Sequence, residues 1–163
     1  MSETKLSIYP NKKMMKSIFQ ISLSLLLLMT LIECKTVKHT ADKLPATQLQ
    51  FGNGGGFAGK ETTFILLENG QLFSKNTKGE YTEMVKVGAK SAKKCFKACT
   101  DISTFKYNNP GNIYNFVGMT TDSTRCRMTW GGTVAAKDTA MLKKAKNLYD
   151  SLTKLVKEPT AKQ

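Results

Sequence analysis

Apolar and polar residues alternate in two regions of the chain in the way expected of β-hairpins. Residues 62–68 and 71–75 flank an Asn-Gly pair at 69–70, which tolerates the positive φ angles of a type I′ turn. A second hairpin is expected over residues 113–130, with its turn at Asp122-Ser123. Both hairpins predict antiparallel sheet.

Apolar residues recur at helical spacing in two other segments, 89–102 and 135–157. In each segment one face is apolar and the lysines fall outside it. Pro159 ends the second helix. The residues expected to face the core are Ala92, Cys95, Phe96, Cys99 and Ile102 in the first helix and Met141, Ala145, Leu148, Leu152 and Leu155 in the second.

Short strands are also expected at 48–51 and 81–87, and a loop at 108–112. The order of strands, helix, strands and helix predicts a single α+β domain over residues 48–158, followed by a tail at 159–163. We expect an antiparallel sheet of about five to six strands, covered by two helices on one face, behind an N-terminal signal peptide.

The signal peptide is predicted from an apolar segment near the N-terminus. Residues 17–32 are mostly apolar, lysines 12, 13 and 16 precede them, and Cys34 follows. An apolar run this short, with basic residues before it, is typical of a cleaved signal peptide rather than a membrane-spanning helix. We expect the signal peptide to occupy residues 1–33, with 1–13 as an upstream extension if translation starts at Met14 or Met15.

The residues around Cys34 resemble the lipobox of bacterial lipoproteins, in which signal peptidase II cleaves before a cysteine that then receives acyl chains. Leu31 matches the leucine at the third position before that cysteine, whereas Glu33 departs from the usual small residue. The resemblance implies a lipid anchor at Cys34 in a bacterial envelope membrane, facing the periplasm or the cell surface. An uncleaved N-terminal anchor and an ordinary secreted protein are the alternatives.

Residues 34–47 are predicted to form a flexible tether behind the lipidated cysteine. They are polar, contain Pro45 and show no periodic apolar pattern. A chain of about thirteen residues reaches roughly 45 Å when fully extended. His39, the only histidine, lies here and is expected to be a solvated side chain rather than a ligand or a base.

The chain is strongly basic, with a formal net charge of +13 that comes almost entirely from lysine. Arg125 and Arg127 are its only arginines. Ammonium groups act as point charges without the bidentate geometry of guanidinium, so this composition favours solubility and weak attraction to anionic polymers. Proteins that read nucleic acids usually cluster arginines or exposed aromatics among their basic residues, and we expect no nucleic-acid partner.

Residues 54–60 match the first seven positions of a P-loop, G-x-x-x-x-G-K. Glu61 stands where a P-loop has its Mg²⁺-binding hydroxyl, and a strand pattern follows instead of the helix that binds phosphate. We therefore expect no nucleotide and no other cofactor. The glycines predict an irregular loop or bulge between two strands. A partner-binding loop is the functional alternative, with the residues Gly54, Gly55, Gly56, Phe57 and Gly59.

The domain contains three cysteines. Cys95 and Cys99 are expected on one face of the first helix, a spacing at which they bridge each other poorly. Cys126 lies in the second hairpin and could pair with either Cys99 or Cys95 in an oxidising compartment. Small core side chains without a disulfide are the alternative. With too few ligands near them, these cysteines predict no zinc site.

No arrangement of residues in the sequence predicts catalysis. The acidic residues behind Cys34 are scattered among turns and helix surfaces, whereas acid–base chemistry needs groups that converge. Trp130 is expected at the edge of the core rather than as a stacking platform for a ligand. We therefore expect a non-enzymatic protein without a metal site.

Four short motifs lie between residues 51 and 132. They are Phe51-Gly52-x-Gly54-Gly55-Gly56-Phe57-x-Gly59, Leu66-Leu67-x-Asn69-Gly70-x-Leu72-Phe73, Pro110-Gly111-Asn112-x-Tyr114-x-Phe116 and Thr129-Trp130-Gly131. Together they resemble a group of small lipoproteins of Gram-negative bacteria that have no known activity. The resemblance implies an envelope location and a shared fold, and it assigns no functional residues.

These observations favour a binding or structural module of the envelope, which presents its glycine-rich loop and strand edges to an envelope protein. An enzyme or enzyme inhibitor with an unrecognised site is the second hypothesis. The third is a cationic domain that associates with anionic envelope polymers, and a steep loss of polymer binding with added salt would distinguish it from the first. The sequence predicts no oligomeric state.

The lipobox makes a prediction about processing. Replacing Cys34 with alanine removes the sulfur that carries the acyl chain, so Cys34→Ala should leave unprocessed precursor. Mass spectrometry of the wild-type protein should find a mature chain that begins at Cys34 and carries acyl mass. A wild-type N-terminus at another residue, without acyl mass, would show that the protein is not a lipoprotein.

Overall fold

The computed structural model describes residues 37–132 and 139–157. The predicted signal peptide, Cys34, the start of the last predicted helix and the tail at 159–163 lie outside these residues. Neither helix that the structure describes combines the length and the apolar composition of a membrane-spanning segment.

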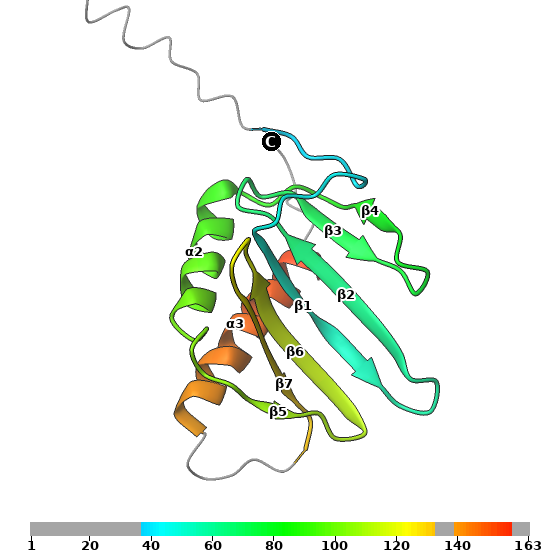
Figure 1. The fold of residues 1–163 in the computed structure, drawn as a ribbon, viewed down its shortest axis with the longest axis vertical. Helices are drawn as coiled ribbons and strands as arrows, with labels where there is room; N and C mark the ends of the chain where they lie inside the picture. The colour runs from blue at the N-terminus through cyan, green and yellow to red at the C-terminus, as the bar shows by residue number, and fades with distance from the viewer. Residues whose placement is uncertain (1–36, 133–138, 158–163) are drawn as a thin grey trace, which may run out of the picture. The chain divides into compact units, whose positions relative to one another are not determined.

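Over the described residues the domain is α+β, with one seven-stranded sheet and two helices (Figure 1). The sheet order is β4-β3-β2-β1-β6-β7-β5. The elements are β1 (Gln48–Gly55), β2 (Lys60–Leu66), β3 (Leu72–Lys75), β4 (Tyr81–Glu83), α2 (Ala89–Thr100), β5 (Asn108–Asn109), β6 (Ile113–Thr120), β7 (Arg125–Trp130) and α3 (Thr139–Lys157).

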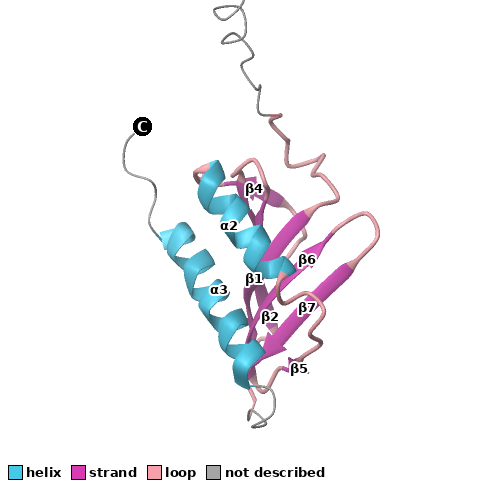
Figure 2. Cartoon of the chain, turned by 90° about the vertical axis from the view of Figure 1, so that its left-hand side faces the viewer, coloured by secondary structure: helices cyan, strands magenta, loops and turns pink. Residues whose placement is uncertain are grey.

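Both helices lie on the same face of the sheet, as Figure 2 shows. Their apolar faces pack on side chains from the central strands, which forms the main core. Eight of the ten predicted core positions are buried, among them Ala92, Cys99, Ala145 and Leu152, which are fully buried. Met141 and Leu155 are only partly buried, and Leu142, which was not predicted, is buried instead. We call the opposite face of the sheet, over which no described helix lies, the open face.

The prediction of an antiparallel sheet of about five to six strands needs correction, because the sheet has seven strands and is mixed. The additional strand is β5, which pairs in parallel with β7. The backbone N–H of Thr129 donates to the carbonyl of Tyr107 at 2.9 Å, and that of Gly132 donates to the carbonyl of Asn109 at 3.1 Å. An Asn-Asn-Pro-Gly run shows no strand pattern, so only the tertiary contact reveals β5.

The glycine-rich segment was expected to be an irregular loop, but its first half belongs to β1. Gly52 and Gly54 pair with β2 on one side and β6 on the other. Backbone hydrogen bonds on both sides hold this segment extended, although its glycines have no side chains that could pack against the neighbouring strands. Only residues 56–59 form the turn.

Residues 37–47, expected to form part of the tether, lie against the domain. The backbone N–H of His39 donates to Oε1 of Gln71 at 2.7 Å, and its carbonyl accepts from Nε2 of the same side chain at 2.9 Å. Ala41 and Leu44 pack on a small cluster formed by Ile65, Leu67 and Phe73. The segment therefore covers apolar side chains that the helices do not reach, which explains why it is ordered despite its polar sequence.

The turn between β2 and β3 also differs from the prediction. The N–H of Leu67 donates to the carbonyl of Gln71 at 2.9 Å, so these two residues form the last backbone pair of the hairpin. The loop between them therefore contains three residues, 68–70, rather than the predicted two. Gly70 is the residue with positive φ, at 88°. Its Cα lies so close to the carbonyl of Val87 that a Cβ would clash with it. Glycine is thus required here both for its conformation and for its lack of a side chain.

Gly55 and Gly56 allow a prediction about stability. Both have positive φ, 95° and 70°, but a Cβ at Gly55 would clash with the carbonyl of Asn112, whereas one at Gly56 meets no atom within 4 Å. Gly56→Ala should therefore cost only the backbone strain, about 1 kcal/mol. Gly55→Ala should cost more, about 2–3 kcal/mol, because the β1–β6 pairing must also shift. Urea denaturation of both variants tests this, and equal costs would contradict it.

Candidate functional site

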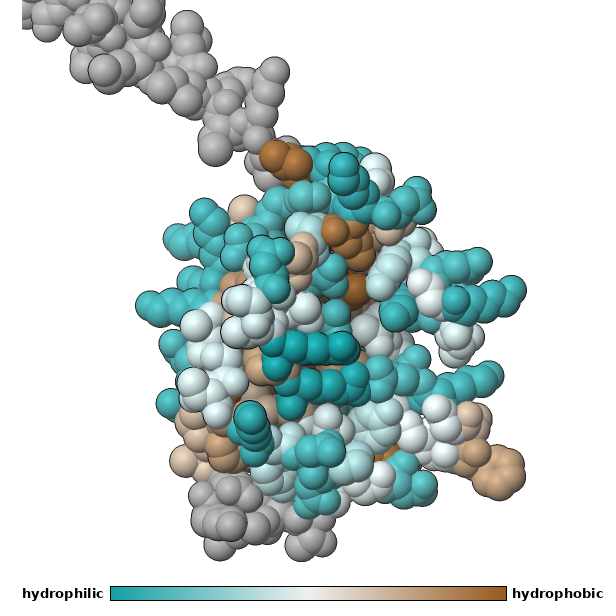
Figure 3. Space-filling view, in the orientation of Figure 1, coloured by the Kyte–Doolittle hydropathy of each residue, from teal (hydrophilic) through white to brown (hydrophobic). Residues whose placement is uncertain are grey.

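The most exposed apolar side chain of the described residues lies at the tip of the β1–β2 hairpin. We call residues 56–59 the hairpin tip. Phe57 is fully exposed there, with a relative exposure of 112%. The N–H of Gly59 donates to the carbonyl of Gly56 at 3.1 Å, which closes the turn. Figure 3 shows the tip at the lower right as a hydrophobic projection from a largely hydrophilic surface.

The hairpin tip is joined to the neighbouring strand as well as to its own hairpin. The N–H of Gly56 donates to the carbonyl of Asn112 at 2.8 Å. Ile113 pairs with Gly55 and is itself 67% exposed, so a second apolar side chain lies at this end of the sheet. Of the predicted loop residues, Gly56, Phe57 and Gly59 form the tip, whereas Gly54 and Gly55 belong to its base in β1.

A hydrogen-bonded network crosses the open face at the base of the hairpin. We call it the open-face network, and it consists of Glu61 on β2, Tyr114 on β6 and Arg127 on β7. Arg127 Nη2 lies 2.6 Å from Glu61 Oε2 and Nη1 lies 3.4 Å from Oε1. The Tyr114 hydroxyl donates to Glu61 Oε2 at 2.9 Å. The network thus links three strands of the sheet across the central strand β1.

Glycines in β1 make room for this arrangement. A Cβ on Gly54 would lie 2.6 Å from the Tyr114 hydroxyl, and one on Gly52 would clash with the Thr62 carbonyl of β2 and lie 3.0 Å from the Phe116 ring. The Phe116 ring is fully buried although it lies on the open face, because the Arg127 guanidinium stacks over it at 3.7 Å. Such a cation–π contact both covers the ring and positions the guanidinium for Glu61.

The charge state of Glu61 suits a structural role. Partial burial acts to raise the pKa of this carboxyl, but hydrogen bonds from Arg127 and Tyr114 outweigh burial, and the pKa is lowered. The hydrogen bond to Glu61 in turn raises the pKa of the Tyr114 hydroxyl. At neutral pH the pair therefore stays a carboxylate and a phenol. A carboxylate held in this way is a poor general base, so the network joins strands rather than moving protons.

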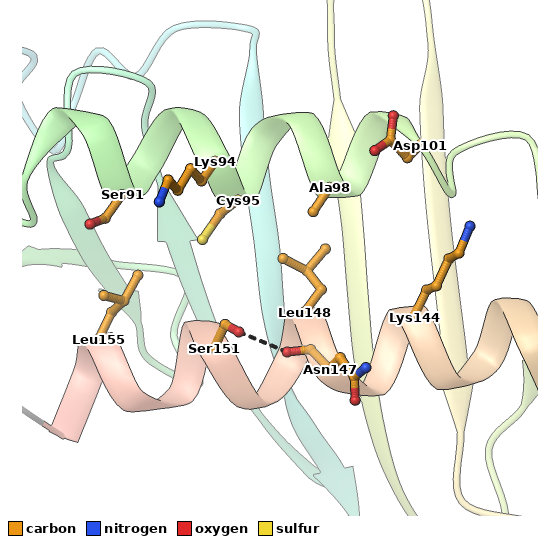
Figure 4. A pocket seen from close by; sticks show the side chains of 10 residues that line it. All are labelled: Ser91, Lys94, Cys95, Ala98, Asp101, Lys144, Asn147, Leu148, Ser151 and Leu155. Carbon is orange, nitrogen blue, oxygen red and sulfur yellow. Dashed lines mark hydrogen bonds between the residues drawn. The ribbon is translucent and has the colours of Figure 1, made fainter.

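A groove runs between α2 and α3 on the outer side of the helices (Figure 4). Its volume is about 570 Å³. Cys95, Ala98, Leu148 and Leu155 give it an apolar floor, and lysines lie on its rim. Asp101 is the one carboxylate among its lining residues. The Ser151 hydroxyl donates a hydrogen bond to the Asn147 carbonyl of its own helix at 2.9 Å. Nothing in this lining pairs two groups for acid–base chemistry.

Two smaller cavities lie at opposite ends of the sheet. One, of about 390 Å³, is bordered by Trp130 and Asp150. Trp130 is only 5% exposed and packs edge-on against Tyr149, as expected of a residue at the edge of the core. The other cavity, of about 300 Å³, is bordered by His39 and Glu68. Among the described residues, no group of His, Cys, Asp and Glu could hold a metal ion.

The three described cysteines are free thiols, and the structure distinguishes between the two pairings that the sequence left open. Cys99 is buried on α2 and donates a hydrogen bond to the half-buried Cys126 on β7. This bond lowers the pKa of Cys126 and raises that of Cys99. Cys95 lines the groove between the helices instead, and burial raises its pKa. Cys99, rather than Cys95, is therefore the neighbour of Cys126.

Sequence reasoning missed the open-face network. Glu61 was noted only as a residue that does not fit a P-loop, and Arg127 only for its rarity. A usable signal was present, because Tyr114 and Phe116 are two residues apart and so lie on the same face of a predicted strand. The next strand of the same hairpin carries the chain's only two arginines. What the sequence does not contain is the strand order, which brings β7 and β2 to either side of β1 and β6.

Comparison with the models of known protein families gives no match, and no curated protein matches the chain.

The open-face network predicts a pH-dependent contribution to stability. Because the pKa of Glu61 is lowered by folding, its contribution is present above the unfolded-state pKa and is lost as the pH falls through the folded-state pKa. Glu61→Gln should cost about 1 kcal/mol at neutral pH, a value typical of a half-exposed pair, and nothing in acid. Chemical denaturation across the pH range measures this. Arg127→Met should add little to Glu61→Gln, and full additivity would argue against the network.

The cysteine geometry predicts an order of reactivity. Iodoacetamide should alkylate Cys126 before Cys95, and Cys99→Ala should slow Cys126 because it removes the hydrogen bond that stabilises the thiolate. With glutathione disulfide, the Cys99 and Cys126 thiols should become one disulfide as two glutathione thiols are released. Peptide mapping by mass spectrometry follows both reactions. A Cys95–Cys126 bridge would contradict the observed pairing.

Proposed function

We propose that this protein is a lipid-anchored envelope lipoprotein whose domain is a non-enzymatic binding module. Its binding element is the hairpin tip, and its partner is an envelope protein with an apolar pocket that accepts Phe57. The observation that carries the proposal is the full exposure of Phe57 on a turn that the rest of the domain holds in place.

The exposure of Phe57 is energetically informative. Burying a phenylalanine side chain stabilises a protein by about 1.5–3 kcal/mol, and this side chain contributes none of that to its own fold. Single exposed apolar residues are common, but aromatic side chains are concentrated at the centres of protein–protein contacts. Here Ile113 is exposed at the same end of the sheet and gives the contact a second apolar side chain.

The base of the hairpin supports the same conclusion. β1 is paired along its length on both sides, and Glu61, the second residue of β2, is held by Arg127 and Tyr114. A binding element that is already in its bound conformation loses less entropy when it associates. The open-face network therefore fits a device that holds the tip in position.

The proposed anchor follows from the resemblance of residues 31–34 to a lipobox and from the basic, apolar segment before it. It accounts for a domain that follows an apolar N-terminal segment by only a few residues. Association with anionic polymers is the second candidate function, supported by the lysines that cover both helices.

The proposal predicts that one side chain carries much of the binding. In a pull-down from native envelope membranes with the intact lipidated protein, Phe57→Ser should reduce capture of the specific partner by about 30-fold, the loss typical of a strong contact residue. The control is Thr77→Ser, which changes an exposed side chain in the turn between β3 and β4, outside the hairpin tip. Equal capture by the two variants would rule out the hairpin tip as the binding element.

A further inference from the structure

The packing of residues 37–47 shortens the link between the domain and its proposed lipid anchor. The Val37 carbonyl accepts a hydrogen bond from Asn69 Nδ2 at 2.6 Å. The backbone N–H and the carbonyl of His39 are both hydrogen-bonded to the Gln71 side chain. Only Lys35 and Thr36 separate Cys34 from Val37 in the sequence. Three residue steps span about 11 Å at most, compared with the roughly 45 Å expected for a free tether. The end of the domain that carries Val37 must therefore stay close to a bilayer that holds Cys34.

That end of the domain, at the top of Figure 1, we call the anchor end. It contains Val37, the turn after β2, the connection between β4 and α2, and the first turn of α2. The C-terminal turn of α3 lies there too, because Leu155 faces Ser91 across the groove (Figure 4). The anchor end is thus built from segments that are far apart in the sequence.

The exposed side chains of the anchor end have the composition of a membrane-surface site. Val37 is 68% exposed and Val85 48% exposed. Exposed lysines lie on four of the segments at this end. Glu68 and Glu83 are exposed carboxylates there, and Glu83 lies 3.7 Å from Lys38, so that this pair adds no net charge. The lysines are Lys38, Lys86, Lys90, Lys93, Lys94, Lys154 and Lys157.

We infer that the anchor end rests on the surface of an anionic phospholipid bilayer, with Val37 and Val85 at the level of the headgroups and the lysines against the headgroup charges. The inference deepens the proposed function and rests on its lipid anchor at Cys34. It assigns the domain an orientation: the hairpin tip lies at the other end of β1, which has eight residues and so spans about 26 Å. The tip therefore points away from the bilayer, toward a partner.

Two considerations favour a bilayer over an acidic protein as the occupant of this surface. The short link keeps the anchor end next to the membrane at all times. The bilayer is therefore already within reach, whereas an acidic protein would first have to diffuse to this surface. Each lysine close to an anionic surface raises the occupancy of the membrane-docked state by about fivefold. This electrostatic attraction falls off within a Debye length, about 10 Å at moderate salt. The possible distance of the anchor end from the bilayer is therefore comparable to the range over which its lysines act.

Tryptophan quenching by brominated lipids can test this orientation. The intact lipidated protein would be reconstituted into vesicles of brominated phosphatidylcholine with or without phosphatidylglycerol, as V85W or as F57W, with the wild-type Trp130 signal subtracted. V85W should be quenched several-fold more strongly than F57W in the anionic vesicles, and added salt should reduce the difference. Equal quenching of the two variants, or none for V85W, would overturn the inference.

Charge reversal at two lysine pairs, one on α2 and one on α3, provides a matched control. Lys90→Glu with Lys93→Glu, at the anchor end, should reduce occupancy of the docked state by about 25-fold or more and abolish the quenching of V85W. Lys143→Glu with Lys146→Glu, near the start of α3, changes the same net charge and should leave the quenching intact. Equal effects of the two pairs would show that only overall charge matters and would overturn the inference.

Flotation of the same vesicles in high salt separates this inference from the proposed anchor. A protein that washes off in high salt has no lipid anchor, and the proposed function fails with it. A protein that stays on the vesicles but shows no quenching of V85W keeps its anchor and contradicts the docking alone. Salt-sensitive binding of the Lys90 and Lys93 region to soluble polyglutamate, without quenching on vesicles, would instead assign this end to an acidic protein.

Discussion

The sheet has helices on one of its two faces, and the fold depends on how apolar side chains on the other face are covered from water. The two helices cover the strand residues that point toward them, and neither of the described helices covers the open face. Two devices replace a second layer. Arg127, bonded to Glu61, lies over the Phe116 ring, and residues 37–47 cover the cluster around Phe73. Both use polar backbone or side-chain groups on their outer side, which leaves the covered face compatible with water.

The first device also explains the glycines of β1. A central strand would ordinarily present β-branched side chains on both faces, and here Gly52 and Gly54 present none on the open face. The space is filled from the neighbouring strand by Phe116 and Tyr114, so that aromatic rings lie across the glycine backbone. Glu61, the residue that disqualified the P-loop pattern, is the one that fixes Tyr114 and Arg127 in place. The glycine-rich sequence thus serves the packing of the sheet rather than a phosphate.

Much of the fold could be predicted from the sequence because it is encoded in local periodicity. The two helices and the β6–β7 hairpin follow directly from apolar spacing, and the order of elements gives the α+β class. The features that could not be predicted depend on tertiary contacts. β5 has two residues in a run of strand-breaking types, and residues 37–47 have no periodicity because they pack with isolated side chains such as Leu44. For the candidate site, Phe57 was identified within the loop, whereas the open-face network depends on strand order.

The ordering of residues 37–47 changes what an anchor at Cys34 would do. With a free tether of thirteen residues, the domain could rotate relative to the membrane, and the position of the hairpin tip would be undefined. With the chain held from Val37 onward, any force or restraint at the anchor is transmitted to the sheet through Asn69 and Gln71, at the turn that begins β3. The exposed large apolar side chains of the described residues lie at the two ends of the sheet, Val37 and Val85 at one and Phe57 and Ile113 at the other. A rigid sheet with one contact surface at each end can set the distance between a membrane and a bound partner, which a domain on a flexible tether cannot do.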